Sequence, residues 1–177
     1  MEQKTSFWKA AMTYGLYMGI ALIIYSVILY VAGQTFNQTL GYVSFVIMIV
    51  GIVWAQMNYK KLQGGMLTYG QGVGIATSLM LIAGIIGAIY TILLYKVIDP
   101  ELYDQYLLFY EEKASASMIE QGLSDAQIDQ ALTISKRFQT PVIMAITAII
   151  TYVIAGVIIG LIASIFTKKK PSEEIEE

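Results

Sequence analysis

Charged side chains are confined to four segments of this chain, and this distribution constrains the fold more than any other feature. The charged segments are 2–9, 60–61, 96–137 and 168–177. The three intervals between them contain no charged residue and are rich in Ile, Leu and Val. A membrane-spanning helix needs roughly 20 apolar residues, and an ionisable group at the bilayer centre costs at least about 2.5 kcal/mol. The charge-free intervals are therefore expected to lie in lipid.

The lengths of these intervals predict four spans. The first interval, 10–59, would form a helix of about 75 Å, more than twice the roughly 30 Å hydrocarbon core, so it must hold two spans. The polar segment 33–39 is expected to separate them. A glycine-rich turn is expected over 64–72, and Pro141 suits a first helical turn. The predicted spans are residues 10–32, 40–58, 73–95 and 141–167.

These spans predict an all-α integral membrane protein, a four-transmembrane-helix bundle that forms a single membrane domain over residues 1–177. An extracytoplasmic helical hairpin is expected over 96–140, between helices three and four, and a cytoplasmic tail over 168–177. The first apolar stretch, of about 23 residues, is too long for a signal-peptide core of roughly 7–15 residues, so it is expected to be retained.

Lysine distribution predicts the orientation of the spans. Lys4, Lys9 and the residues of the two basic clusters would share one face, whereas four basic residues are spread over the 96–140 loop. By the positive-inside rule, both termini are then cytoplasmic. The expected topology anchors are Lys60, Lys61, Lys168, Lys169 and Lys170.

Small residues at a spacing of four recur on every predicted span. Such rows allow close approach of helix backbones, which drives association in lipid. The candidate packing residues are Gly15, Gly19, Gly51, Ala55, Ala83, Gly87, Gly156 and Gly160. Packing inside the monomer is the more common use of such rows, and a homodimer face is the alternative.

Most polar side chains of the predicted spans are those of serine, threonine and tyrosine. Tyr14, Met18, Ala21 and Tyr25 fall on one stripe at helical spacing. The stripe has two interpretations: the lining of a small-molecule cavity, or interhelical hydrogen bonding by buried hydroxyls, which is the more ordinary one.

The 96–140 loop is predicted to form two amphipathic helices. Asp99 and Pro100 are typical of an N-cap and first position, and Leu102, Tyr106, Phe109 and Tyr110 give an apolar face. A break at 121–122 precedes a capping-box pattern over 124–127. The apolar face expected for the second helix is Ile128, Ala131, Leu132, Ser135 and Phe138.

Eight acidic and four basic residues lie in this loop. A cation site or a partner surface would use such a charge excess, but carboxylates more often solvate exposed helix faces. Glu111 and Glu112 are adjacent, and neighbouring residues of a helix point about 100° apart. This pair is therefore a poor metal clamp.

Missing residue types exclude many kinds of chemistry. The chain contains no Cys and no His, which removes thiolate and imidazole ligands, nucleophiles and bases. Its net charge of −2 gives no basic face for nucleic acid. No catalytic, cofactor-binding or metal-binding residue is predicted, and no cofactor is expected. The expected partners are the lipid bilayer and either a membrane protein or a second copy of the chain.

The chain resembles the bacterial membrane proteins of domain-of-unknown-function family 4199. The resemblance rests on Tyr59-Lys60-Lys61, Gly64-Gly65 and Thr68-Tyr69-Gly70-Gln71 before the third span, on 95–101 at its exit, and on 121–124. It covers about residues 8–166. It implies a four-span, multi-pass protein of a bacterial inner membrane and supplies no activity or catalytic residue.

A non-enzymatic scaffold or accessory subunit is the leading functional hypothesis, because charge is absent from the spans and the loop suits protein contact. The alternative is a small facilitator-type transporter or channel, motivated by the hydroxyl groups of the spans and the glycines of 64–74. An intramembrane enzyme ranks third, since Ser26, Ser78 and Ser164 would each lack a histidine base.

Overall fold

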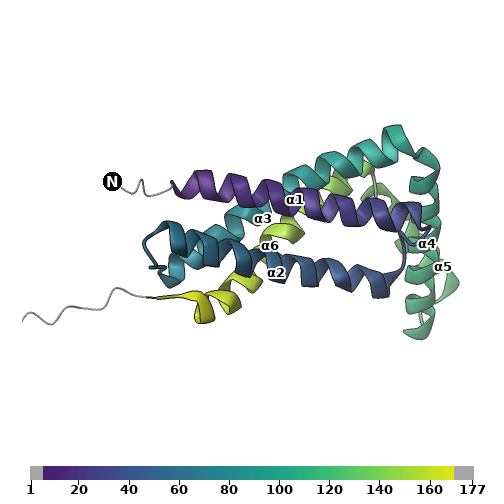
Figure 1. Cartoon of the computed structure of the whole chain (residues 1–177). Helices are drawn as coiled ribbons and strands as arrows, with labels where there is room; N and C mark the ends of the chain where they lie inside the picture. The colour runs from purple at the N-terminus through teal and green to yellow at the C-terminus, as the bar shows by residue number, and fades with distance from the viewer. Residues whose placement is uncertain (1–5, 170–177) are drawn as a thin grey trace, which may run out of the picture. The chain divides into compact units, whose positions relative to one another are not determined.

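The computed structural model describes residues 6–169, and these are almost entirely helical (Figure 1). The elements are α1 (Phe7–Val31), α2 (Gln38–Leu62), α3 (Tyr69–Leu93), the π-helical segment η1 (Leu94–Ile98), α4 (Pro100–Glu120), α5 (Asp125–Arg137) and α6 (Pro141–Thr167). Within this part of the chain, four helical stretches are long and apolar enough to cross a membrane: Phe7–Val31, Gln38–Leu62, Tyr69–Ile98 and Pro141–Thr167. A 25-residue helix is about 38 Å long, which exceeds the hydrocarbon thickness of a bilayer.

The chain divides into two compact units. The first unit contains the described residues up to 86 and from 149, and the second unit contains residues 87–148. Helices α3 and α6 each contribute residues to both units. The first unit therefore holds α1 and α2 with parts of α3 and α6, whereas the second holds α4 and α5.

Side-chain caps define where α2 and α3 begin. The Asn37 side chain accepts hydrogen bonds from the backbone N–H groups of Thr39 and Leu40, at 3.0 and 3.3 Å. At the start of α3, Thr68 N–H donates to Gln71 Oε1 (3.0 Å) and Gln71 N–H donates to Thr68 Oγ1 (3.3 Å). This reciprocal cap starts α3 at Tyr69, so the turn predicted over 64–72 is too long.

The turn itself depends on two glycines. Gly64 and Gly65 have φ angles of +70° and +83°, a backbone region that costs other residues strain. The turn also pairs with the chain after α6, because Leu67 and Lys169 exchange backbone hydrogen bonds of 3.0 and 2.9 Å. The end of α6 is thereby held against the α2–α3 turn.

The third candidate span ends in a π-helical segment, η1, that no sequence pattern predicts. Asp99 N–H donates to Leu94 O at 2.8 Å, a hydrogen bond that spans five residues. The helical stretch therefore continues to Ile98, three residues beyond the predicted end at Tyr95. Asp99 then caps α4 as predicted, accepting from Leu102 N–H at 3.0 Å.

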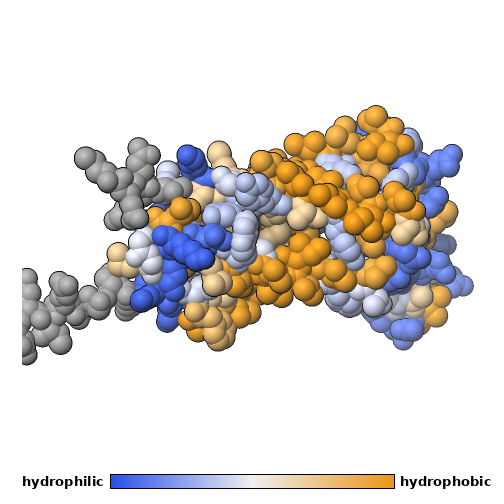
Figure 2. Space-filling model, in the orientation of Figure 1, coloured by the Kyte–Doolittle hydropathy of each residue, from blue (hydrophilic) through white to orange (hydrophobic). Residues whose placement is uncertain are grey.

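The first unit has an apolar core drawn from all four of its helices. Ile52, Ala76, Leu79, Met80 and Ala83 have no exposed surface, and Met18 and Ala163 belong to the same cluster. Only 11–33% of an apolar 18-residue window of each candidate span is buried, and every candidate span has large apolar side chains that are exposed. Figure 2 shows these side chains along α1 and α2, with hydrophilic ones gathered where α2 leads into α3. Such a surface requires lipid as its solvent.

The second unit contains the two predicted loop helices. Glu111 of α4 pairs with Lys136 of α5 at 2.9 Å, and the Tyr103 hydroxyl donates to Gln139 O at 3.1 Å. Leu102 and Ile128, one from each predicted apolar face, are both 6% exposed. Phe138 is 64% exposed, so its predicted place on the apolar face of α5 is wrong. It follows the last residue of α5 and forms the C-cap.

Candidate functional site

The small residues of α1 lie where α3 packs most closely. A Cβ atom added at Gly15 would lie 2.7 Å from Ile82 Cβ and 2.8 Å from Leu79 O. One added at Gly19 would lie 3.0–3.1 Å from the Ile86 side chain. A methyl group at Gly15 would therefore force its neighbours to shift, and one at Gly19 would press tightly on Ile86, so these glycines allow the close approach of α1 and α3.

The other candidate packing residues occupy similar contacts. A Cβ at Gly51 would collide with the end of the Met18 side chain, while Cβ atoms at Gly156 and Gly160 would lie 2.8 Å from Met80 Cβ and 2.7 Å from Ala76 Cβ. Ala55 and Ala83 are 1% and 0% exposed. Gly87 lies in the second unit, is half-buried, and accepts a hydrogen bond from Thr91 Oγ1 at 3.0 Å.

The tyrosine stripe of α1 divides between its two interpretations. Tyr14, Met18 and Ala21 line a cavity of about 400 Å³ between α1 and α2. The Tyr25 hydroxyl instead donates to Leu40 O at 2.7 Å, which joins the far end of α1 to the start of α2. Cavity lining and interhelical hydrogen bonding therefore both occur, at different positions of one stripe.

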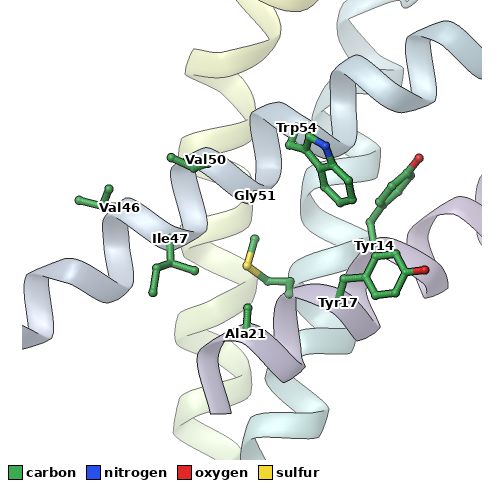
Figure 3. A pocket seen from close by; sticks show the side chains of 9 residues that line it. Tyr14, Tyr17, Ala21, Val46, Ile47, Val50, Gly51 and Trp54 are labelled. Carbon is green, nitrogen blue, oxygen red and sulfur yellow. The ribbon is translucent and has the colours of Figure 1, made fainter. Parts of the chain in front are cut away.

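This cavity, the α1/α2 groove, is largely apolar. Val46, Ile47, Val50, Gly51 and Trp54 line its α2 side, and Tyr17 joins the stripe residues on α1. The Tyr14 and Trp54 rings meet edge to face, with centroids 5.4 Å apart. In Figure 3, the tyrosine hydroxyls point away from the gap between the helices, which the aliphatic side chains line. Such a lining suits a hydrocarbon group better than a polar solute.

A buried polar cluster at the other side of α2 was missed by the sequence analysis. Gln56 is 0% exposed, and its Nε2 donates to Gly72 O (3.0 Å) and to Ser164 Oγ (3.1 Å). Its Oε1 accepts a hydrogen bond of 2.9 Å from Thr167 Oγ1. The cluster joins α2, α3 and α6. A glutamine in an apolar span, with small or hydroxyl residues on the other spans, was the signal that could have revealed it.

The predicted lysine anchors lie together at one end of the first unit. Lys60 Nζ donates to Thr167 O at 2.9 Å, and Lys168 Nζ lies 6.0 Å from the centroid of the Tyr69 ring. Lys60, Lys61 and Lys169 line a second cavity, of about 410 Å³. Lys170 lies outside the described residues.

The acidic loop contains no assembled cation site among residues 6–169, because no three carboxylates there converge. The ion pair between Glu111 and Lys136 in this loop is partly exposed. Burial, followed by the neighbouring Tyr110 and Tyr103, raises the pKa of Tyr106 above its ordinary value of 10.0. The Tyr106 ring packs beside those of Tyr95 and Tyr110, at centroid distances of 6.1 and 6.2 Å.

Comparison with known proteins identifies the family and no activity. No curated protein and no solved structure matches the chain significantly. The model of one protein family, described as protein of unknown function (DUF4199), matches residues 13–169. This match covers three of the candidate spans in full, the first span from residue 13 onward, and helices α4 and α5. The chain therefore belongs to the DUF4199 family of proteins of unknown function.

Proposed function

We propose that the protein is a non-enzymatic membrane scaffold or accessory subunit, which acts by holding another membrane protein or a second copy of itself. The observation that carries this proposal is the filled interior of the first unit. Ile52, Leu79 and Met80 have no exposed surface there. A closed core supports a helix-packing role, whereas a solute carrier needs a polar passage through its spans.

The buried polar groups of the first unit support the same role. Gln56, Ser164 and Thr167 bond to one another and to backbone groups. Three of these four hydrogen bonds join different helices, where they stabilise the bundle. The spans also lack the histidine or paired carboxylate that a reaction or proton path would use, which favours a non-enzymatic role.

In vivo photocrosslinking tests this role directly. A photoreactive residue at Val50, in the α1/α2 groove and 63% exposed, is compared with one at Ile158 of α6, which is 53% exposed and outside the groove. A scaffold should give a discrete protein adduct of constant mass at one of these positions, in native membranes. Adducts with lipid alone at both positions, together with a monomeric protein in mild detergent, would remove the proposal.

The alternative function is a small facilitator-type transporter or channel, and the α1/α2 groove is the feature that favours it. The groove has room for a small molecule, but its lining is aliphatic and aromatic. A facilitator would therefore carry an apolar solute. Flux into reconstituted vesicles, abolished by Gly51→Leu inside the groove and retained by Gly41→Leu in open space, would favour this alternative over scaffolding.

We propose that the protein lies in a bacterial inner membrane. Both chain termini and the lysine-rich end of the first unit would then lie in the cytoplasm. The clustering of Lys60, Lys61, Lys168 and Lys169 at one end of the first unit supports this orientation. On the same reasoning, α4 and α5 form an extracytoplasmic hairpin.

A further inference from the structure

The second cavity of the first unit, the lysine pocket, combines cationic and apolar walls. Lys60 and Lys61 reach it from the last turn of α2, and Lys169 from the chain just after α6. Phe166 and Met57 supply apolar wall, and their side chains are 81% and 51% exposed. Gly65, in the turn between α2 and α3, completes one side. The pocket holds about 410 Å³ and opens outward.

The charge around this pocket is one-sided. The described part of the first unit contains five lysines, at 9, 60, 61, 168 and 169, and no Asp or Glu. The Lys60 ammonium carries three N–H donors, of which Thr167 O accepts one. Three lysine residues line this cavity, and the described first unit has no carboxylate to pair with them, so their ammonium groups can donate hydrogen bonds to an external anion.

We propose that the lysine pocket binds the phosphate of an anionic phospholipid, with Lys60, Lys61 and Lys169 as the headgroup ligands. Phosphate oxygens accept hydrogen bonds from ammonium groups, and basic pockets between membrane helices hold anionic headgroups. The lipid's acyl chains run along the exposed Phe166 and Met57 side chains. Lipid binding at this pocket does not depend on the proposed scaffolding role.

The surroundings favour a lipid over a soluble phosphate ion. The pocket lies at the ends of two candidate spans, α2 and α6, where the headgroup region of a bilayer begins. A free phosphate ion would make no apolar contact with Phe166 and Met57. A phospholipid can contact the lysines through its phosphate and these apolar side chains through its acyl chains, because the two parts are covalently joined.

Two charge-matched double variants separate this pocket from general attraction. Lys61→Gln with Lys169→Gln removes two pocket lysines, and the backbone pairing of Lys169 with Leu67 is independent of the side chain. Lys9→Gln with Lys168→Gln removes the same charge from the same unit, but neither residue lines the pocket. The double variant Lys61→Arg with Lys169→Arg keeps the charge and serves as the conservative rescue.

The experiment is native mass spectrometry of the delipidated full-length protein, titrated with phosphatidylglycerol or with phosphatidylcholine. Wild-type protein should bind phosphatidylglycerol at least about fivefold more tightly than phosphatidylcholine. The pocket variant should weaken phosphatidylglycerol binding by roughly tenfold, and the matched variant by less than about twofold. The arginine variant should bind like wild type, which also shows that the pocket variant's loss is one of charge.

Three results would overturn the proposal. Equal weakening in the two glutamine variants would mean diffuse electrostatic attraction. Equal affinity for the two lipids would mean that the pocket does not distinguish anionic from zwitterionic headgroups. Displacement of phosphatidylglycerol by inorganic phosphate at millimolar concentration would mean that the pocket serves a soluble anion.

Discussion

Gln56 and Ser164 show how a polar side chain is accommodated inside an apolar unit. Both are fully buried, and they lie on different helices, α2 and α6. Their hydrogen bond of 3.1 Å is complemented by the bonds from Gln56 to Gly72 O and from Thr167 to Gln56. In lipid, a group that loses its partner finds no water to replace it, so this cluster is expected to fix the register of three helices.

Replacing Gln56 with alanine should therefore destabilise the protein. Each buried interhelical hydrogen bond in a membrane protein contributes about 0.6–1.7 kcal/mol, and Gln56→Ala removes three while leaving a void. We expect a loss of about 2–4 kcal/mol in the free energy of unfolding, measured by denaturation in mixed micelles. Asn58→Ala is the control, because the described hydrogen bond of the Asn58 side chain is to Trp54 O of its own helix. This variant should change the free energy of unfolding by under about 0.5 kcal/mol. Equal effects of the two variants would contradict a special role for the cluster.

Two glycines give opposite expectations for the same substitution. Gly15→Ala places a methyl group against Ile82 and Leu79 O, and should cost about 1–3 kcal/mol of stability through overpacking. Gly41 lies within α2, and a Cβ atom there would face open space. Gly41→Ala should therefore be neutral or stabilising by up to about 1 kcal/mol, because alanine favours the helix. Thermal unfolding of both variants in detergent measures the difference. A tolerated Gly15→Ala would mean that α1 and α3 approach less closely.

The sequence predicts the small packing residues better than the polar ones. A spacing of four places Gly15 and Gly19 on one helix face, and close approach is a local property of that face. The cluster around Gln56 depends instead on which residues of α3 and α6 arrive opposite it. Gly72 and Ser164 lie 16 and 108 positions away in the chain, so no spacing rule connects them.

At the scale of the elements, side-chain caps decide where helices begin. Asp99 accepts the Leu102 N–H at 3.0 Å, and Pro100 occupies the first position of α4. Asp99→Ala should lose about 1 kcal/mol of local stability, which corresponds to roughly fivefold faster amide exchange in the first turn of α4. Asp104→Ala, an exposed position of the same helix, should leave that exchange unchanged. Hydrogen exchange with mass spectrometry compares them, and equal rates in all three proteins would contradict the cap's contribution.

Element boundaries were predictable where a single residue type determines them. Pro141 begins α6 as expected, and the 121–122 break precedes α5. The predicted start of α3 at residue 73 is four residues late, because the glycines of 64–72 suggest a turn although Thr68 and Gln71 cap a helix there. The π-helical segment at 94–98 depends on a hydrogen bond between Asp99 and Leu94 that no local composition signals.

At the scale of the whole molecule, lipid must solvate the outward-facing side chains of every span. Ile24, Val50, Ile154 and Ile158 are each more than half exposed, although they are as apolar as the core. A water-soluble bundle would direct such residues inward. In the proposed four-span topology, each crossing moves the chain to the opposite face of the membrane.

Single-cysteine labelling tests this topology, and the natural chain suits it because it has no cysteine. Met66→Cys lies between α2 and α3, and Glu120→Cys at the end of α4, so one candidate span separates them. In right-side-out vesicles, a membrane-impermeant maleimide should label Glu120→Cys at once and Met66→Cys only after lysis. Gln34→Cys, between α1 and α2, should behave like Glu120→Cys, because two crossings separate these positions. Labelling of positions 66 and 120 from the same side would mean that α3 does not span, whereas the reverse pattern would keep the four spans and place the lysine-rich end outside.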